Sequence, residues 1–106
     1  MHDETWSKSE KTIARRAFEQ AYDRECAALA GEVRRRAISI KSPGDMWALH
    51  DLLTRERRET DEKYDYRYSV LIFVFTRLIR EGWLSEAELK GLAEEKLERI
   101  RRLLEL

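Results

Sequence analysis

Glycine and proline are scarce in this chain of 106 residues, at four and one. A fold with many strands needs turn residues at short intervals, so this scarcity argues against one. Cys26 is the single cysteine, which excludes a disulfide within the chain and fits a reducing compartment. Because Cys26 lies on an apolar helical stripe, we expect an inert, buried thiol rather than a reactive one.

A net charge is also lacking, because 21 Lys and Arg balance 21 Asp and Glu. General binders of nucleic acid or acidic membranes carry a basic excess, so neither class is expected. The longest uninterrupted apolar run covers residues 70–75, far short of the roughly 20 residues that a membrane span requires. The polar opening MHDETWSKSE has no apolar region typical of a secretory signal. These absences predict a cytoplasmic protein without membrane insertion.

The residues that are abundant favour helix. Charged residues make up 40% of the chain and hydrophobic residues 42%, which is too apolar for a disordered protein. Ala, Leu, Glu and Arg are all good helix formers. A chain of this length is one domain, so we expect a single all-α domain over residues 1–106.

The first helix is expected to begin after Ser7. Ser7 and Glu10 form the S-x-x-E capping box, in which each side chain accepts a hydrogen bond from the backbone N–H of the other. Apolar residues then recur every three or four positions on a helix of about nine turns. They are Phe18, Tyr22, Cys26, Leu29, Val33, Ala37 and Ile40. Such a narrow stripe is typical of a stalk that packs against another helix.

The segment KSPGD predicts a break and a second helix. Ser42 can cap this helix, Pro43 suits its first position, and Asp45 favours its positive end. One seam then carries Met46, Leu49, Leu53, Arg57, Thr60 and Tyr64. The guanidinium of Arg57 stands where the pattern requires an apolar group. We expect the two helices to form a stalk over about residues 7–64.

The segment KYDYRYSVLIFVF, residues 63–75, joins this stalk to the most apolar part of the chain. Residues 70–75 alone fit a buried strand or a buried helix. The apolar spacing continues at helical intervals to Trp83, and Gly82 suits the position after a helix end. We therefore expect a helix, with residues 70–75 at the centre of the core of a head over about residues 65–106.

The last helix is expected to begin after Ser85. Ser85 and Glu88 form a second capping box, and Leu84 and Leu89 are placed for a hydrophobic staple. The apolar side of this helix is expected to carry Leu89, Leu92, Leu97, Ile100, Leu103 and Leu104.

Catalytic and metal-binding patterns are missing. His50 and Asp51 are adjacent, and neighbouring residues on a helix do not face each other, which argues against a Ser-His-Asp arrangement. His50 has no carboxylate or second histidine one turn away, and the sequence contains neither a C-x-x-C motif nor a phosphate-binding glycine loop. We expect no catalytic residues, no metal and no cofactor.

Two features are candidates for contacts with a partner. The basic clusters at residues 34–36, 57–58 and 101–102 fit solvated helix faces better than a nucleic-acid site, since Glu is interleaved with them. Trp47, His50, Asp51 and Arg57 are harder to explain, because Trp and Arg are enriched at interface hot spots. From the pattern alone, an internal network in the core and an interface fit these four residues equally well.

The stretch DMWALHDLLTRERRETDEKYDYRYSVLIFVFTRLIREGWL, residues 45–84, closely resembles the fluorescence recovery protein family of cyanobacteria. The similarity extends more weakly from Trp6 to the C-terminus. The segments W-x-L-H-D, K-Y-D-Y-R-Y-S-V-L-I-F-V-F and E-G-W carry it, in this order. The chain departs from the family pattern at Leu52, Thr60, Glu62 and Pro43–Gly44.

The resemblance implies an all-α fold in which long stalk helices form a dimer and carry a small helical head. Members of the family are not enzymes. They bind the photoactivated form of the orange carotenoid protein, mainly at its C-terminal domain, speed its red-to-orange reversion and detach it from the phycobilisome. The implied partner-binding residues are Trp47, His50, Asp51, Arg57, Phe73 and Arg99. Peripheral association with the thylakoid or the phycobilisome is compatible with this role.

A second function remains open at this point. Relatives occur in bacteria without the carotenoid protein, so a helical dimer that serves as an adaptor or binding module for another protein is the alternative.

We predict a homodimer held by Met46, Leu49 and Leu53 of the second helix and by Leu29 and Val33 of the first. A head this small cannot cover the long stripe. The substitution Leu49→Glu would bury an unpaired charge at several kcal/mol or expel the second chain. Light scattering should therefore show the mass falling to that of one chain. A wild-type protein that is monomeric at micromolar concentration would contradict the prediction.

Overall fold

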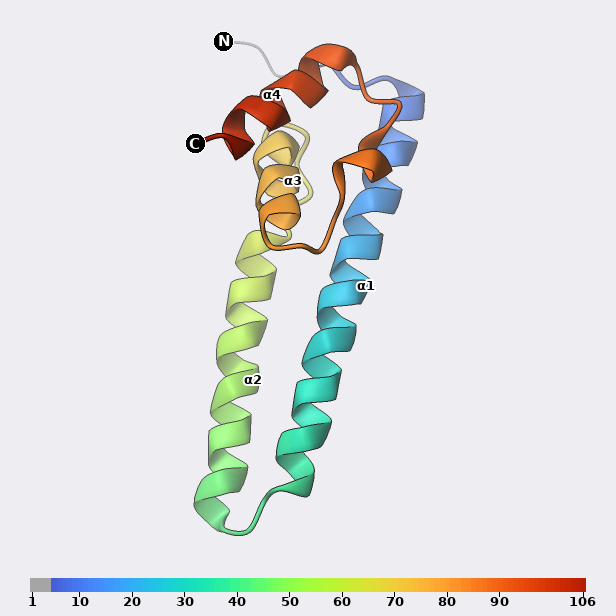
Figure 1. Ribbon diagram of the computed structural model, residues 1–106. Coiled ribbons are helices and arrows are strands. Elements are labelled where there is room, and N and C mark those ends of the chain that lie inside the picture. Colours follow the sequence, from blue (N-terminus) through green and yellow to red (C-terminus); the bar gives the residue numbers. More distant parts are fainter. Residues whose placement is uncertain (1–4) are drawn as a thin grey trace.

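The structure is a computed structural model that describes residues 5–106, and its regular elements are all helices. The order is α1 (Lys8–Ile38), α2 (Pro43–Lys63), α3 (Leu71–Arg80), the short 3-10 helix η1 (Glu86–Leu89) and α4 (Glu94–Leu104). Figure 1 shows α1 and α2 as a long antiparallel hairpin, the stalk. The remaining helices gather at its open end as the head, which confirms the all-α expectation. Residues 1–4, with which the expected domain and its polar opening begin, lie outside the described range.

Both stalk helices begin as the sequence predicts. The Ser7 hydroxyl accepts a hydrogen bond from the Glu10 N–H at 3.1 Å, and Glu10 Oε1 accepts one from the Ser7 N–H at 2.9 Å. At the second start, the Ser42 hydroxyl accepts from the Asp45 N–H at 3.2 Å, and Pro43 is the first helical residue. Local side-chain chemistry therefore determines where each helix begins.

The apolar run at residues 70–75 forms a helix and not a strand. Helix α3 starts at Leu71 and is followed by Gly82, whose φ of 86° places it in the left-handed region. Leu71 and Phe75 are fully buried, whereas Phe73 is 53% exposed. The prediction that the whole run is central to the core is therefore wrong at Phe73, because the side chain on the outer face of a helix meets solvent even within an apolar run.

The prediction of one uninterrupted last helix is also wrong. The Ser85 N–H donates to Glu88 Oε1 at 2.9 Å, but this capping box starts only the short helix η1. The chain then turns at Gly91, whose φ is 109°, and α4 begins at Glu94. A Cβ atom at Gly91 would clash with Ile13 Cδ1 on α1, so the turn lies directly against that helix.

The core is confined to the head and to the adjoining half of α1. It contains Trp6, three alanines of α1, and the apolar sides of α3, η1 and α4. Within the stalk beyond residue 21, Leu52 is the one apolar residue that is buried. Met46 and Leu53 are 45% and 40% exposed, although the sequence places them on an apolar seam. A single chain therefore leaves much of the stalk seam in contact with solvent.

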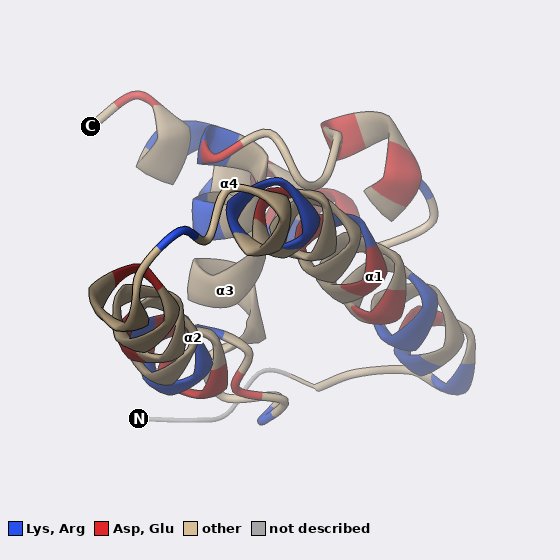
Figure 2. Cartoon of the chain, turned by 90° about the horizontal axis from the view of Figure 1, so that it is seen from below, with Lys and Arg blue, Asp and Glu red and all other residues tan. Residues whose placement is uncertain are grey.

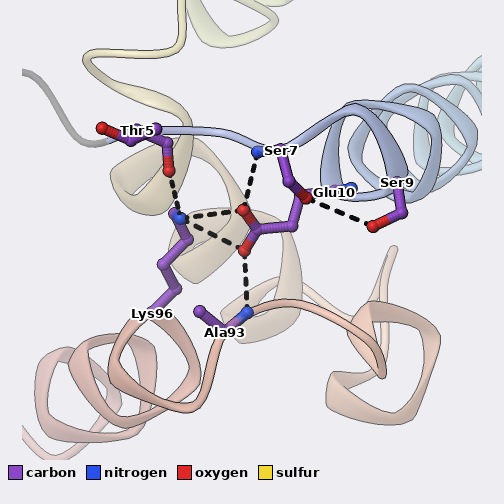
Figure 3. A network of polar contacts seen from close by, with 6 residues as sticks. All are labelled: Thr5, Ser7, Ser9, Glu10, Ala93 and Lys96. Carbon is purple, nitrogen blue, oxygen red and sulfur yellow. Dashed lines mark hydrogen bonds and ion pairs between the residues drawn. The ribbon is translucent and has the colours of Figure 1, made fainter.

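A buried ion pair joins the two ends of the chain inside the head (Figure 3). The Lys96 Nζ lies 3.1 Å from each carboxylate oxygen of Glu10 and donates to the Thr5 carbonyl at 2.6 Å. Glu10 Oε2 also accepts from the Ala93 N–H, the residue that precedes α4, at 2.8 Å. Burial would raise the pKa of the Glu10 carboxyl, but hydrogen bonds from Ser7, Ala93 and Lys96 outweigh burial and hold that pKa below its usual range.

The substitution Lys96→Met tests this pair. It leaves the Glu10 carboxylate buried without its cation, so we expect the free energy of unfolding to fall by about 3–5 kcal/mol. Lys90→Met at an exposed position should change it by less than about 0.5 kcal/mol. Urea denaturation of both variants at neutral pH provides the comparison, and equal stabilities would contradict the assignment.

The same pair predicts the direction of acid destabilisation. The Glu10 pKa is lower in the folded chain than in the unfolded chain, so its contribution to stability is present above the unfolded pKa of about 4.5. That contribution should be lost as the pH falls through the lower folded pKa. Urea midpoints measured from neutral pH downward should fall less steeply for Lys96→Met than for wild type.

Candidate partner-binding surface

The first half of α2 presents an aromatic and charged surface to solvent. Trp47 is 58% exposed, and its ring lies edge-on to the imidazole of His50 with 6.1 Å between ring centroids. His50 Nδ1 lies 3.5 Å from Asp51 Oδ1, and both side chains are mostly exposed. The expectation that these adjacent residues do not face each other is wrong for this pair, because their polar atoms come within ion-pair distance at the exposed surface.

Arg57 lies on the surface of the same helix. Its side chain is 81% exposed, and Nε donates to Asp61 Oδ2 at 3.1 Å, one turn further along. This contact excludes the internal core network as an explanation for Arg57, because neither member of the ion pair is buried. Trp47 and Arg57 are about 15 Å apart along the helix axis, so the four α2 residues form an extended surface strip rather than a pocket. We call Trp47, His50, Asp51 and Arg57 the α2 strip.

Two further expected partner residues meet in the head. Phe73 of α3 and Arg99 of α4 line the same shallow hollow of about 270 Å³, together with Arg102, Leu103 and Leu106. Helix α4 packs across α3 here, which brings residues 26 positions apart to one place. Figure 1 shows α3 and α4 in the head and the first half of α2 on the stalk, so within one chain the six residues form two separate surfaces.

The structure also shows a hollow that the sequence did not predict. It has a volume of about 420 Å³ and lies between α1 and α2 where the stalk meets the head. The rings of Phe18 and Tyr22 contact Tyr64 edge-on, with centroid distances of 5.4 and 5.1 Å. Asp61, the partner of Arg57, lines it too. The two apolar stripes were visible in the sequence, but their meeting point depends on how the helices cross.

Beneath this hollow, a buried lysine fixes the stalk to the head. Lys63 Nζ lies 2.6 Å from Glu25 Oε2 on α1 and 2.6 Å from Glu81 Oε1 just after α3. The hydroxyl of Tyr64 donates to the other oxygen of Glu25 at 2.8 Å. Burial, followed by this hydrogen bond to a carboxylate, raises the pKa of Tyr64 well above its usual range. The α2 strip is therefore carried on a helix whose end is held in one position.

In residues 5–106, no three His, Cys, Asp or Glu side chains are grouped so as to hold a metal ion. No helix in that range is both long enough and apolar enough to cross a bilayer.

The described residues define a class of helical protein in which a stalk of two long helices carries a helical head. Residues 6–104 match the family model described as photoprotection regulator fluorescence recovery protein. The chain therefore belongs to the fluorescence recovery protein family, which confirms the resemblance carried by residues 45–84.

Individual relatives share both sequence and fold with this chain. The fluorescence recovery protein of Synechocystis sp. (strain ATCC 27184 / PCC 6803 / Kazusa) is 43% identical over 101 residues, which is 95% of this chain and 93% of that protein. The solved structure of the Fremyella diplosiphon fluorescence recovery protein is 48% identical, with a TM-score of 0.90, and covers 96% of this chain and 100% of its own. The structure from Synechocystis sp. PCC 6803 is 42% identical, with a TM-score of 0.91 and the same coverage.

Arg57→Leu should leave the fold intact. An exposed ion pair one helical turn apart contributes about 0.3–0.5 kcal/mol, so the free energy of unfolding should change by no more than about 0.5 kcal/mol. Lys63→Met, which removes the buried cation shared by Glu25 and Glu81, should lower the free energy of unfolding by several times as much. Urea denaturation followed by circular dichroism measures both variants. A loss for Arg57→Leu as large as that for Lys63→Met would make Arg57 a structural residue.

Proposed function

We propose that this protein binds the photoactivated orange carotenoid protein, mainly at the C-terminal domain of that partner. It thereby speeds the red-to-orange reversion and detaches the carotenoid protein from the phycobilisome, which ends photoprotective quenching. Family membership supports a role in photoprotection. Its place of action is the cytoplasm, at the thylakoid surface where phycobilisomes lie.

The observation that carries the proposal is the exposure of the α2 strip. Exposed Trp and Arg side chains dominate the binding energy of protein interfaces, and here Trp47 and Arg57 are 58% and 81% exposed on a rigid helix. Arg57 forms only a weak ion pair in water, with Asp61, and this pair can be exchanged for a carboxylate of the partner with little loss. A strip of this kind binds a protein surface and not a small molecule, because it is convex.

The mechanism follows from differential binding. A protein that speeds a conformational change must bind the transition state of that change more tightly than it binds the starting state. We propose that the α2 strip binds the C-terminal domain of the carotenoid protein in the active form and holds it as the two domains of that partner close. Weak affinity for the orange form then releases the regulator, so one molecule acts repeatedly.

The head supplies a second contact in this proposal. Phe73 presents an apolar ring beside Arg99 in the shallow hollow, a combination that suits an apolar side chain next to a carboxylate. A second copy of the chain covers the exposed seam of Met46, Leu49 and Leu53, as the sequence predicts.

The direct test follows the decay of the red form in darkness by absorbance. Substoichiometric wild-type protein should accelerate the red-to-orange decay of a photoactivated orange carotenoid protein. Arg57→Leu should lose most of this acceleration, since an arginine at a hot spot contributes about 2 kcal/mol or more.

Arg55→Leu is the matched control. Arg55 is exposed on the same helix and is not part of the α2 strip, so this variant should retain the acceleration. Equal activity of both variants would remove Arg57 from the site. A wild-type protein that accelerates none of several carotenoid proteins would favour the alternative, an adaptor for a different protein partner.

A further inference from the structure

The first turns of α1 carry an unusual concentration of positive charge. Lys8, Lys11, Arg15 and Arg16 are all exposed, and they line one end of an open hollow of about 600 Å³. Glu19 and Asp23 line its other end. Figure 2 shows this distribution of charge, with Lys and Arg at the N-terminal end of α1 and acidic residues towards the middle of the helix. We call this surface, defined by these six residues, the split-charge face.

These four cations form no ion pairs within residues 5–106. Elsewhere in that range, arginines are commonly paired, as in Arg24 with Glu88 at 2.6 Å and Arg101 with Glu86 at 2.9 Å. The chain has as many acidic residues as basic ones, so carboxylates are not in short supply. The cations of the split-charge face are therefore left available for an anion outside the chain.

Helix stability does not account for the position of the two lysines. The first turn of a helix carries partial positive charge, which favours Asp and Glu there and disfavours residues such as Lys8 and Lys11. Two of the cations are nevertheless held in place by aromatic rings from the α2–α3 link. The Lys11 ammonium lies 5.3 Å from the Tyr68 ring centroid, and the Arg15 guanidinium carbon lies 3.8 Å from that of Tyr66. Such contacts fix the side chains before a ligand arrives, which lowers the entropy lost on binding.

We infer that the split-charge face binds a segment of the partner protein, and that this segment also carries its positive and negative charges in separate halves. Its acidic side chains contact the four cations, and its basic side chains contact Glu19 and Asp23. Lys8 to Arg15 spans about 10 Å, which matches acidic residues spaced over two turns of a partner helix. Nucleic acid and anionic lipid carry uniform negative charge, which would be repelled by the acidic half. That this segment belongs to the orange carotenoid protein rests on the proposed function.

The docking face can be tested without that protein. The probe is an alanine-based helical peptide with glutamates in one half and lysines in the other. A peptide of the same composition with the charges alternating is the matched control, and a single-stranded oligonucleotide represents uniform polyanions. Amide NMR spectra of the ¹⁵N-labelled full chain at low salt should show the largest shifts at residues 8–23 with the divided peptide. Equal shifts from the alternating peptide, larger shifts from the oligonucleotide, or no shifts at residues 8–23 would overturn the inference.

Binding kinetics then assign the partner. The double variant Lys8→Glu/Arg16→Glu reverses two charges whose side chains make no contact that the fold needs. Its association with photoactivated carotenoid protein at low salt should be roughly tenfold slower than that of wild type, and raising the salt should remove most of the difference. Arg34→Glu/Lys41→Glu, with the same charge change at the far end of the stalk, should associate nearly as fast as wild type.

The association rates distinguish the assignment of the partner from the proposed function. Equal slowing of both double variants would show an effect of net charge alone and would overturn the assignment of the split-charge face to this partner. A wild-type protein that does not bind the carotenoid protein would instead contradict the proposed function, and the peptide titration alone would then decide whether the docking face exists.

Discussion

The ion pair between Glu10 and Lys96 is the contact on which the head depends. One carboxylate caps the first turn of α1, accepts the backbone N–H of Ala93 at the start of α4, and neutralises a lysine buried among apolar groups. A buried pair is favourable only when its remaining hydrogen-bonding positions are filled, and here the Thr5 carbonyl and the Ser7 and Ala93 amides fill them. The two ends of the described chain are thereby held together, and the core closes between them.

The stalk has no comparable source of stability within one chain. Beyond Ala21 it buries a single apolar residue, Leu52, and most polar contacts on its outer surface are exposed ion pairs of small net value. This contrast between a closed head and an open stalk explains why the α2 strip is exposed although one end of its helix is fixed. Lys63 and its two carboxylates hold one end of α2 to the head, while Trp47 and Arg57 face outward.

Local chemistry made part of this structure predictable. The starts of α1 and α2 follow from Ser7 and Ser42 with their near neighbours, and the helical form of α3 follows from the spacing beyond Phe75. The contact between Glu10 and Lys96 joins residues far apart in the sequence, so no periodicity indicates it. The break between η1 and α4 depends on the close approach of Gly91 to α1, which the sequence does not reveal.

The candidate site was predictable in its residue types but not in its geometry. Arg57 was identified because it interrupts an apolar seam, and Trp47 because Trp and Arg are enriched at interfaces, yet the sequence fitted a core network and an interface equally well. Solvent exposure excludes the core network. Phe73 and Arg99 were carried over from the family resemblance, and only the packing of α4 on α3 shows that they share one hollow.

We propose that the head is stable by itself, whereas the stalk relies on a second chain. Amide hydrogen exchange of the wild-type protein over a dilution series tests it directly. Amides of α3 and of residues 10–21 should keep the same protection at every concentration, whereas those of residues 29–57 should lose protection as the protein is diluted. Protection of residues 29–57 that equals that of the head and does not change on dilution would contradict the account.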